Sequence, residues 1–521
     1  MKFRTMTTGA AVLALCTGPL AVGPAIAAPA PLNAPVRLPG PQAISETDRA
    51  VGAKADAQLS AEYGGVYQGP QSNLVSRVGL TVARQSGVAG ADRSFKFTLL
   101  NSGVPNAFAV PGGYVYCTRG LLALMNDEAE LAFVLGHEAG HITGRHSEKR
   151  GKVVQRNVLL GTLGQTLLGA VLGRGAAGQL GGQIGQAGIQ RLVVGNVMSH
   201  SRAEEFEADD YGVAYMAKAG YDSTASSSIL SSLAAQSALD TKLTGQARTT
   251  PSWAMSHPDP SARVSRSLAR ARAQGIRSGT RSRDAFLLSL QGMLYGDDPQ
   301  QGVIDGQTFK YPADRIQFTA PAGYGMSNGT DAVTITSTAS SGAQTAGTGR
   351  ARFTGGRFDG DLAGVVGRAF MELNSGQAMS GVNPVRTTIG GMDAATATAV
   401  ANDSGGNTLD VTVVAVATAP GVAYSFSVIQ PRGRGLGDLA ALVGSFRKMS
   451  ASEAAAVRPR VIDVVTVGAR DTVAALAARM VYPDRQMERF LVLNGLAPGT
   501  SRIAVGSKVK LVVWGAPSRA G

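Results

Sequence analysis

Two histidines and a glutamate between residues 137 and 141 have the types and spacing of a metal site that can hydrolyse an amide. His137 and His141 are four residues apart, so on a helix their rings project from one face and can bind one Zn²⁺. Glu138 lies beside them. Zinc with three protein ligands keeps a position for water, whose pKa falls to about 7, and a carboxylate can then remove a proton from that water. The pattern predicts peptide-bond hydrolysis, provided that a third ligand exists.

The helix that must carry these residues is supported by its own sequence. Asp127 and Glu130 form a capping-box-like start after Asn126, and residues 131–135 supply a buried apolar body. Polar residues at the end of an apolar helix suggest a site.

Histidine is scarce, and all five copies lie in one part of the chain: His137, His141, His146, His200 and His257. The metzincin pattern H-E-x-x-H-x-x-G-x-x-H would make His146 the third ligand, with Gly144 as its glycine. His146 follows His141 by five positions and not by six, so we interpret it as a structural or second-shell histidine.

A better source of the third ligand is a second acidic motif. Glu205 and Asp209 are four residues apart and would share one helical face. One carboxylate can bind the metal while the other orients a ligand, because zinc-bound histidines usually donate their second N–H to a carboxylate. We give this orienting role to Asp209. Glu204 and Glu207 are interpreted as an acidic, solvated helix face.

Four motifs in this order resemble the gluzincin zinc metallopeptidase family of HtpX, the CaaX prenyl endopeptidase and BepA, in its BepA-like periplasmic branch. They lie within residues 50–275 and are the edge-strand element 106–114 with 118–122, the H-E-x-x-H segment, Glu205-x-x-x-Asp209, and the segment 257–263. The resemblance implies that the zinc ligands are His137, His141 and Glu205 and that the general base is Glu138. It also implies that an extended substrate pairs by β-augmentation with the edge-strand residues Asn106, Ala107, Phe108 and Ala109.

His257 and Arg263 belong to an element similar to the H-P-x-x-x-x-R sequence of the BepA-like branch. By this resemblance, His257 is a switch ligand that fills the open zinc position and keeps the enzyme latent until a substrate or partner moves it. Arg263 would lie in the second shell or face the transition-state oxyanion. The alternative for His257 is a loop histidine near the cleft.

The N-terminus predicts export. Lys2 and Arg4 precede an apolar run that ends at Ala25-Ile26-Ala27, a good cleavage site, so we expect a signal peptide over residues 1–27. The expected location is periplasmic or exported, with peripheral membrane contact left open.

Only one cysteine would remain in the mature chain. Cys16 would leave with the signal peptide, so Cys117 could form no intramolecular disulfide, and we expect it to be buried beside the edge strand.

Composition fits a folded chain of about three domains. Hydrophobic residues make up 44% of the 521 residues, and the net charge of +13 suits work near anionic surfaces. Nucleic acid is excluded as a partner of an exported chain. Seven arginines lie close together in the sequence. They form either a solvated helix face or a docking surface for anionic lipid or an acidic partner. They are Arg263, Arg266, Arg270, Arg272, Arg277, Arg281 and Arg283.

An uncharged, glycine-rich stretch over residues 157–190 is interrupted only by Arg174. Its first part is shorter than the ~20 apolar residues that span a bilayer. We therefore expect packed helices or contact with a membrane surface.

The fold class that these patterns predict is multidomain α+β. After a linker over 28–48, we expect a mostly α-helical zincin protease domain with a small edge-strand sheet over 49–290. An α+β scaffold module with short strands and a helix at 439–446 would follow over 295–450.

Residues 459–515 resemble a LysM domain, a βααβ module associated with peptidoglycan. Asp471-Thr472 and Asn494-Gly495-Leu496 carry this resemblance, while Arg470 replaces the usual glycine. Protein or membrane docking is the alternative use of this module.

The sequence therefore predicts an exported endopeptidase that binds one Zn²⁺ per chain and cleaves unfolded or misassembled cell-envelope proteins in quality control. Its expected partners are extended polypeptides and, through the C-terminal module, an outer-membrane assembly machinery or peptidoglycan. The alternatives are a non-proteolytic periplasmic chaperone or peptidoglycan-binding protein, and an enzyme that lyses peptidoglycan peptides.

Overall fold

The computed structural model describes residues 36–149, 200–244, 253, 257, 259–274, 279–329, 332–338, 349–374, 379–403 and 406–516. The predicted signal peptide and the uncharged stretch at 157–190 lie outside the described residues. Within those ranges, no helix is both long and apolar enough to cross a membrane.

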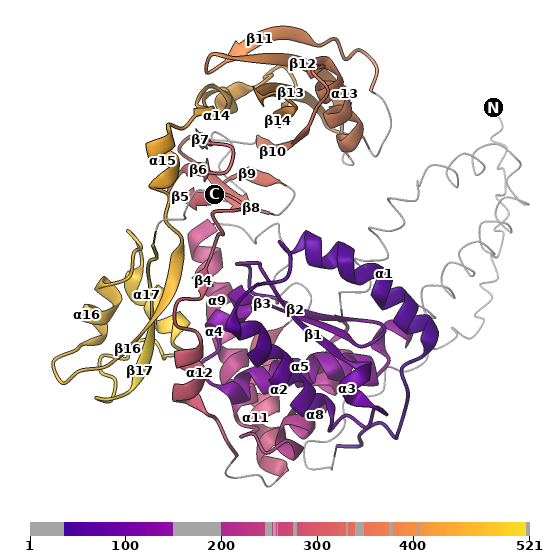
Figure 1. Ribbon diagram of the computed structural model, residues 1–521, viewed down its shortest axis with the longest axis vertical. Helices are drawn as coiled ribbons and strands as arrows, with labels where there is room; N and C mark the ends of the chain where they lie inside the picture. Colours follow the sequence, from indigo (N-terminus) through magenta and orange to yellow (C-terminus); the bar gives the residue numbers. More distant parts are fainter. Residues whose placement is uncertain are drawn as a thin grey trace, which may run out of the picture.

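The lower part of the molecule in Figure 1 consists of helices around a small sheet. Its strands have the order β1-β3-β2, so β2 forms an edge, as expected for the segment at 106–114. The elements are α1 (Glu46–Glu62), α2 (Pro70–Ala83), α3 (Ala91–Ser94), β1 (Lys96–Leu100), β2 (Ala107–Val110), β3 (Tyr114–Thr118), α4 (Arg119–Leu124), α5 (Glu128–Thr143), α8 (Arg202–Lys218), α9 (Ala225–Thr244), α11 (Pro260–Ala273) and α12 (Arg283–Ser289).

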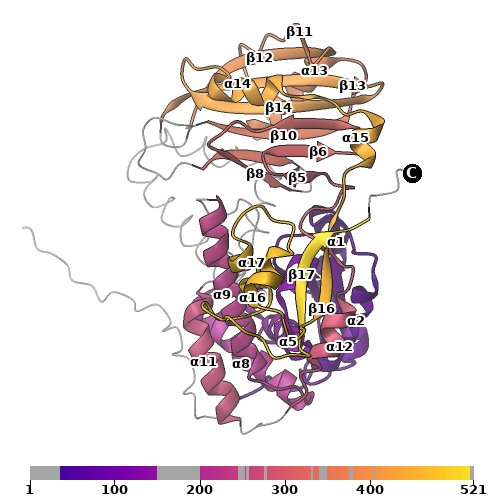
Figure 2. The same ribbon diagram turned by 90° about the vertical axis from the view of Figure 1, so that its left-hand side faces the viewer.

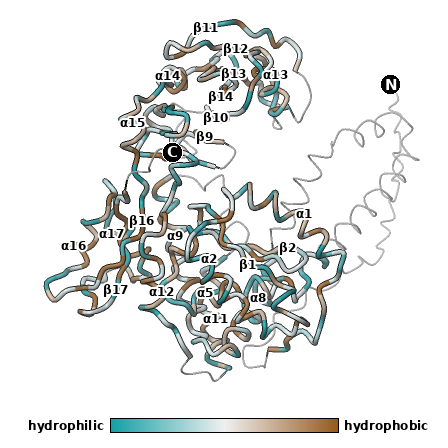
Figure 3. The backbone as a smooth tube through the Cα atoms, in the orientation of Figure 1, coloured by the Kyte–Doolittle hydropathy of each residue, from teal (hydrophilic) through white to brown (hydrophobic). Residues whose placement is uncertain are grey.

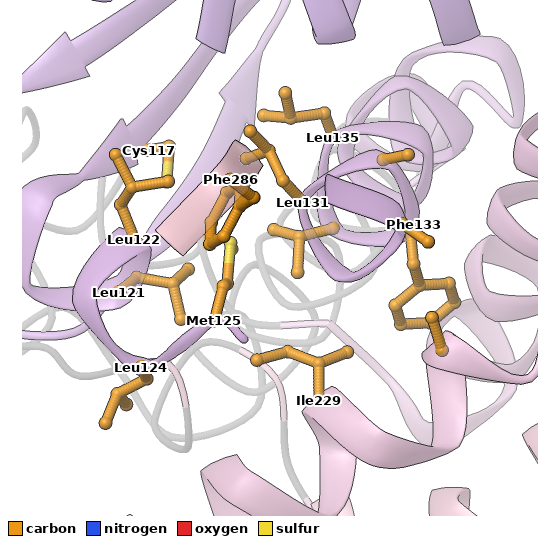
Figure 4. Packing of buried hydrophobic residues seen from close by; sticks show 14 of the residues in the cluster. Cys117, Leu121, Leu122, Leu124, Met125, Leu131, Phe133, Leu135, Ile229 and Phe286 are labelled. Carbon is orange, nitrogen blue, oxygen red and sulfur yellow. The ribbon is translucent and has the colours of Figure 1, made fainter. Parts of the chain in front are cut away.

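The predicted capping of helix α5 is confirmed with one difference of detail. Asp127 is the N-cap and accepts a hydrogen bond from the backbone N of Glu130 at 2.9 Å. The carboxylate of Glu130 in turn accepts from the backbone N of Asn126 at 2.7 Å, one residue before the cap. Figure 4 shows Leu131 and Leu135 of α5 packed near Cys117, which is buried in β3 as expected.

Helices α5 and α8 approach closely because glycines line their contact. A Cβ on Gly212 would lie 2.9 Å from the backbone N of His137, and a Cβ on Gly140 would lie 3.1 Å from Cβ of Tyr211. Larger residues at these positions would separate the helices. The small residues therefore set the distance between the H-E-x-x-H face and the Glu205-x-x-x-Asp209 face.

The upper part is an α+β module. Its larger sheet has seven strands in the order β11-β12-β13-β14-β10-β9-β8, and its smaller sheet has the order β15-β7-β6-β5. The strands are β5 (Val303–Asp305), β6 (Thr308–Tyr311), β7 (Ile316–Thr319), β8 (Tyr324–Asn328), β9 (Val333–Ser337), β10 (Arg350–Arg357), β11 (Val385–Ile389), β12 (Met392–Asn402), β13 (Thr408–Ala419), β14 (Val422–Pro431) and β15 (Arg447–Lys448).

Alternating residues of β13 serve the two faces of the larger sheet. Val413 and Ala415 pack with α13 (Leu362–Leu373), whereas Val414 and Val416 pack with the smaller sheet and α14 (Ala440–Gly444). The helix expected at 439–446 is observed as η1 (Gly437–Leu439) followed by α14, and α15 (Ala451–Ala455) leads out of the module. Hydrophobic residues, brown in Figure 3, occur in the upper and lower parts alike.

The C-terminal segment has the predicted order of strand, two helices and strand: β16 (Arg460–Thr466), α16 (Val473–Ala478), α17 (Gln486–Leu493) and β17 (Lys508–Trp514). Strand β16 also pairs with β4 (Leu294–Tyr295). Figures 1 and 2 place α17 beside α9, and hydrophobic residues of this segment share one core cluster with α5. The relation of the segment to LysM domains stays a prediction.

The interpretation of the arginine-rich segment as a solvated face is wrong for Arg263 and Arg270, which are buried. Among the other described members, Arg272 is exposed and Arg266, Arg281 and Arg283 are partly exposed, and use as a docking surface stays a prediction. Their acidic partners come from distant parts of the chain, so the sequence did not reveal them. The ion pairs are Arg263–Asp209, Arg266–Asp210, Arg270–Asp210, Arg281–Asp127 and Arg281–Asp222.

Candidate metal centre

Four side chains converge at the contact of α5 and α8. The ligand atoms of His137, His141, Glu205 and His257 all lie within 4.8 Å of one another, and all four residues are buried. Nε2 of His137 and Nε2 of His141 are 3.0 Å apart, and Nε2 of His141 is 3.3 Å from Oε1 of Glu205. The spacing rule of four residues therefore placed the two rings correctly, and the third predicted ligand reaches the same point.

The protonation states of these groups suit zinc. Burial lowers the pKa of His137 to about 4 and holds the pKa of His141 well below its usual value, so both imidazoles are neutral. Burial alone would raise the pKa of Glu205, but the charges of His257 and Arg263 hold it well below the usual range. Neutral imidazole and ionised carboxylate are the forms that bind metal, so this donor set fits Zn²⁺.

Glu138 points a buried carboxylate toward the same site. Neither of its oxygens has a hydrogen-bond partner among the described residues, and Oε1 lies 3.4 Å from Nε2 of His257. Burial raises the pKa of Glu138 to about 7. A buried polar group without a partner is costly, and such groups are common where a ligand or catalytic step uses them.

Asp209 and Arg263 support the ligands from behind. Oδ1 of Asp209 is 3.0 Å from Nδ1 of His137, which is the orienting contact predicted from the sequence. Arg263 donates to both oxygens of Asp209, at 2.6 and 2.8 Å, and its Nη1 lies 2.5 Å from Glu205. The guanidinium charge holds the pKa of Asp209 below its usual value, against the effect of burial. Arg263 thus lies behind Glu205 and Asp209, and its contact with an oxyanion stays a prediction.

His257 lies among the ligands rather than at the rim of a cleft. Its Nδ1 is 3.0 Å from Glu205 and 3.2 Å from Nε2 of His137. Its Nε2 is 3.3 Å from the backbone oxygen of Ala107 in β2. The ring stacks on Trp253 with centroids 4.0 Å apart. The role of His257 as a switch ligand stays a prediction.

The edge strand borders the site. Asn106, just before β2, is buried and bonds through its backbone N to Thr118, so its side chain belongs to the protein interior. A cavity of about 350 Å³ follows the far end of the strand and is lined by Ala109, Val110, His141 and Ile142 among others. An extended chain lying along β2 would therefore pass beside His141.

Two residues near His141 have closer contacts than the sequence indicated. Nδ1 of His146 lies 2.7 Å from Nδ1 of His141, and Nε2 of His146 lies 3.1 Å from Glu207. Glu207, interpreted as a solvated residue, is partly exposed and also lies against His146. The side chain of Glu204 forms the capping box at the start of α8 together with Ser201. His200 stacks on His141, with centroids 3.6 Å apart.

Part of the chain that contains this site is similar to known proteins. Residues 70–271 match peptidase family M48. The chain is similar to the beta-barrel assembly-enhancing protease of Yersinia pestis, with 31% identity over 208 residues, which is 39% of this chain and 40% of that protein. The protein of the same name from Escherichia coli K12 is 30% identical over 186 residues, 35% of each chain.

A mitochondrial relative is also similar over a shorter segment. The metalloendopeptidase OMA1 of Bos taurus is 35% identical over 122 residues, 23% of each chain. The chain thus spans less than half the length of the curated relatives that it matches. The matched segment contains the H-E-x-x-H helix, the Glu205 helix and the buried donors between them, and its match to peptidase family M48 agrees with the gluzincin family that the sequence motifs predicted.

Proposed function

We propose that this chain is an exported zinc-dependent endopeptidase that hydrolyses peptide bonds of unfolded or misassembled cell-envelope proteins. The observation that carries the proposal is the convergence of three buried donors, His137, His141 and Glu205, beside the carboxylate of Glu138, which has no hydrogen-bond partner among the described residues. A purely structural zinc site would have no use for such a carboxylate. Zinc held by the three donors would act as a Lewis acid and would lower the pKa of a bound water.

The protein's own groups have separate tasks in this proposal. Glu138 takes a proton from the attacking water and later gives one to the leaving amine, a role for which a pKa near 7 is suited. Asp209 holds the ring of His137 through Nδ1, and Arg263 fixes Asp209 in place. Once the segment that contains Trp253 and His257 moves away, the peptide groups on the side of β2 opposite β3 would hold the substrate backbone extended.

We infer that His257 keeps the enzyme latent. Its ring lies where it can ligate the metal and also covers the carboxylate of Glu138. Trp253 and His257 also occupy hydrogen-bond acceptors of the edge-strand region. The backbone N of Trp253 donates to the backbone oxygen of Pro105, and Nε2 of His257 lies close to the backbone oxygen of Ala107. Pro105 and Ala107 are two residues apart, which is the repeat along one edge of a strand. A substrate strand would therefore compete with both contacts.

The substrate class follows from the relatives, two of which are named for enhancing beta-barrel assembly. Unfolded envelope proteins offer the extended segments that strand addition needs. The C-terminal segment would be the docking element for an outer-membrane assembly machinery or peptidoglycan, and the periplasm would be the location.

Zinc content and cleavage of unfolded casein by the full chain test the proposal. Wild type, Glu138→Gln and His257→Ala should all contain one zinc, while cleavage should be lost in the first variant and raised in the second. Zinc without cleavage in any of the three proteins would reject the endopeptidase and leave the chaperone or cell-wall binding alternative. Pulldown on isolated cell wall would then separate those two.

A further inference from the structure

Two polar side chains, His146 and Glu207, support His141 on the side away from the other candidate ligands. Its Nε2 faces His137 and Glu205, at 3.0 and 3.3 Å, and its Nδ1 faces Nδ1 of His146 at 2.7 Å. His146 is fully buried, and its Nε2 reaches Oε2 of Glu207 at 3.1 Å. The contacts therefore run in series from His141 through His146 to Glu207.

The backbone after α5 is shaped to bring His146 back toward His141. The helix ends at Thr143, and Arg145 takes a left-handed conformation with φ of 52°. That conformation is uncommon for residues other than glycine and turns the chain sharply. Gly144 leaves the space for the returning ring, because a Cβ there would lie 2.5 Å from Nε2 of His146.

The nitrogen of His141 that faces the metal site fixes the proton positions along the series from His141 through His146 to Glu207. If Nε2 of His141 is to offer a lone pair to zinc, its proton must be on Nδ1. Nδ1 of His146 must then accept that proton's hydrogen bond, so the proton of His146 must be on Nε2. Glu207, an acceptor only, completes the series. In this arrangement each hydrogen bond of the series has one donor and one acceptor.

Glu207 is itself held in place. The hydroxyl of Tyr211 donates to its Oε1 at 2.7 Å, and Nζ of Lys149 lies 3.3 Å from its Oε2. The carboxylate at the end of the series is thus fixed by two further contacts.

We propose that His146 and Glu207 are positioning residues that fix the tautomer and orientation of the zinc ligand His141. This inference rests on the proposed zinc site. Asp209 does the same for His137 through one direct contact, whereas His141 is reached through an intervening ring. Both supporting carboxylates lie on α8, the helix that also supplies Glu205. One helix thereby provides a ligand and orients the two others.

The test is the zinc affinity of the full chain, measured by competition with a chromophoric chelator. Outer partners of metal-bound histidine typically contribute 10–100-fold to metal affinity, so His146→Leu and Glu207→Leu should each lose about that much. His146→Gln should recover part of the loss, because its amide oxygen can accept from Nδ1 of His141. The visible absorption bands of bound Co²⁺ should shift in the leucine variants and return toward wild type in His146→Gln.

Lys149→Met is the matched control, since it removes a charge next to Glu207 and leaves the series from His141 intact. It should bind zinc as wild type does. Glu207 is partly exposed, so Glu207→Leu should fold even if His146→Leu does not. Wild-type zinc affinity in the leucine variants would overturn the inference and leave the proposed function standing. Absence of zinc binding by wild type would instead overturn the proposed function itself.

Discussion

Lys510, in the last strand of the structure, donates a hydrogen bond from Nζ to the backbone oxygen of Met125, 385 residues earlier, at 2.6 Å. It also donates to Ala123 at 2.7 Å, and the side chain is fully buried. These carbonyls end α4 just before the helix that carries His137 and His141. The C-terminal segment is therefore built into the same hydrophobic core as α5.

Lys510→Met should lower the free energy of unfolding by about 1–3 kcal/mol, because two buried carbonyls would lose their donor. Lys508→Met is the control, since the Lys508 amine lies at the surface of the same strand. Denaturant titration of both variants checks this. Equal stability of the two variants would show that the buried amine does not hold α4 and β17 together.

The effect of Lys510 should also depend on pH. Burial lowers the pKa of Lys510 from its usual value of 10.5 to about 7. Because the pKa is lower in the folded state, the contribution of Lys510 to stability is fully present above 10.5 and is lost as pH falls toward 7. The stability difference between wild type and Lys510→Met should therefore widen as pH rises from 7 to 10, as followed by thermal unfolding.

Glu138→Gln should lower kcat by about 10²–10⁴-fold, the usual contribution of a general acid–base group. Zinc content should not change, because Glu138 is not among the converging donors. Initial rates on a fluorogenic peptide and metal analysis check both parts. Activity near that of wild type would remove Glu138 from the mechanism.

Asp209→Asn should weaken zinc binding by about 10–100-fold, because Asp209 orients His137. Asp210→Asn is the matched control: the neighbouring carboxylate pairs with Arg266 and Arg270 and touches no ligand. The control should lose stability and keep its zinc affinity. Similar zinc affinities for the two variants would indicate that the effect of Asp209 is general and not directed at His137.

His257→Ala should raise basal cleavage of casein severalfold, because the ring would no longer lie against Glu205 and Glu138. Arg202→Ala is the control, since it removes only an exposed ion pair with Asp259 near the same segment. Exposed pairs contribute about 0–1 kcal/mol, so this variant should stay latent. Unchanged or lower activity of His257→Ala would reject autoinhibition.

Removal of zinc should lower the thermal midpoint of the full chain. A ligand at 100 times its Kd stabilises the folded state by about 2.7 kcal/mol, and chelation removes this term. Glu205→Ala should show a smaller shift on addition of zinc, because it lacks a donor at the centre. A midpoint that is insensitive to chelator in wild type would argue against a bound metal in the folded protein.

The local patterns of the sequence were sufficient for the elements that carry the site. The spacing of His137 and His141 and of Glu205 and Asp209 follows the repeat of one helix turn, and the caps at Asp127 and Ser201 mark the starts of both helices. Short strands such as β6 and β13 were visible from their β-branched and aromatic residues. The helix α13 was not predicted.

What only the tertiary structure decided was which distant residues meet. Arg263 pairs with Asp209, Glu207 with His146, and Lys510 with Met125, and none of these pairs is related by a helical or strand repeat. Local periodicity fixes which face a side chain takes, because it depends on backbone geometry alone. Partners across the core depend on how helices and strands pack, here on glycines such as Gly212 that set the distance between α5 and α8. For that reason the sequence determined which candidate donors share a helical face, whereas the packing determined which distant residues meet them.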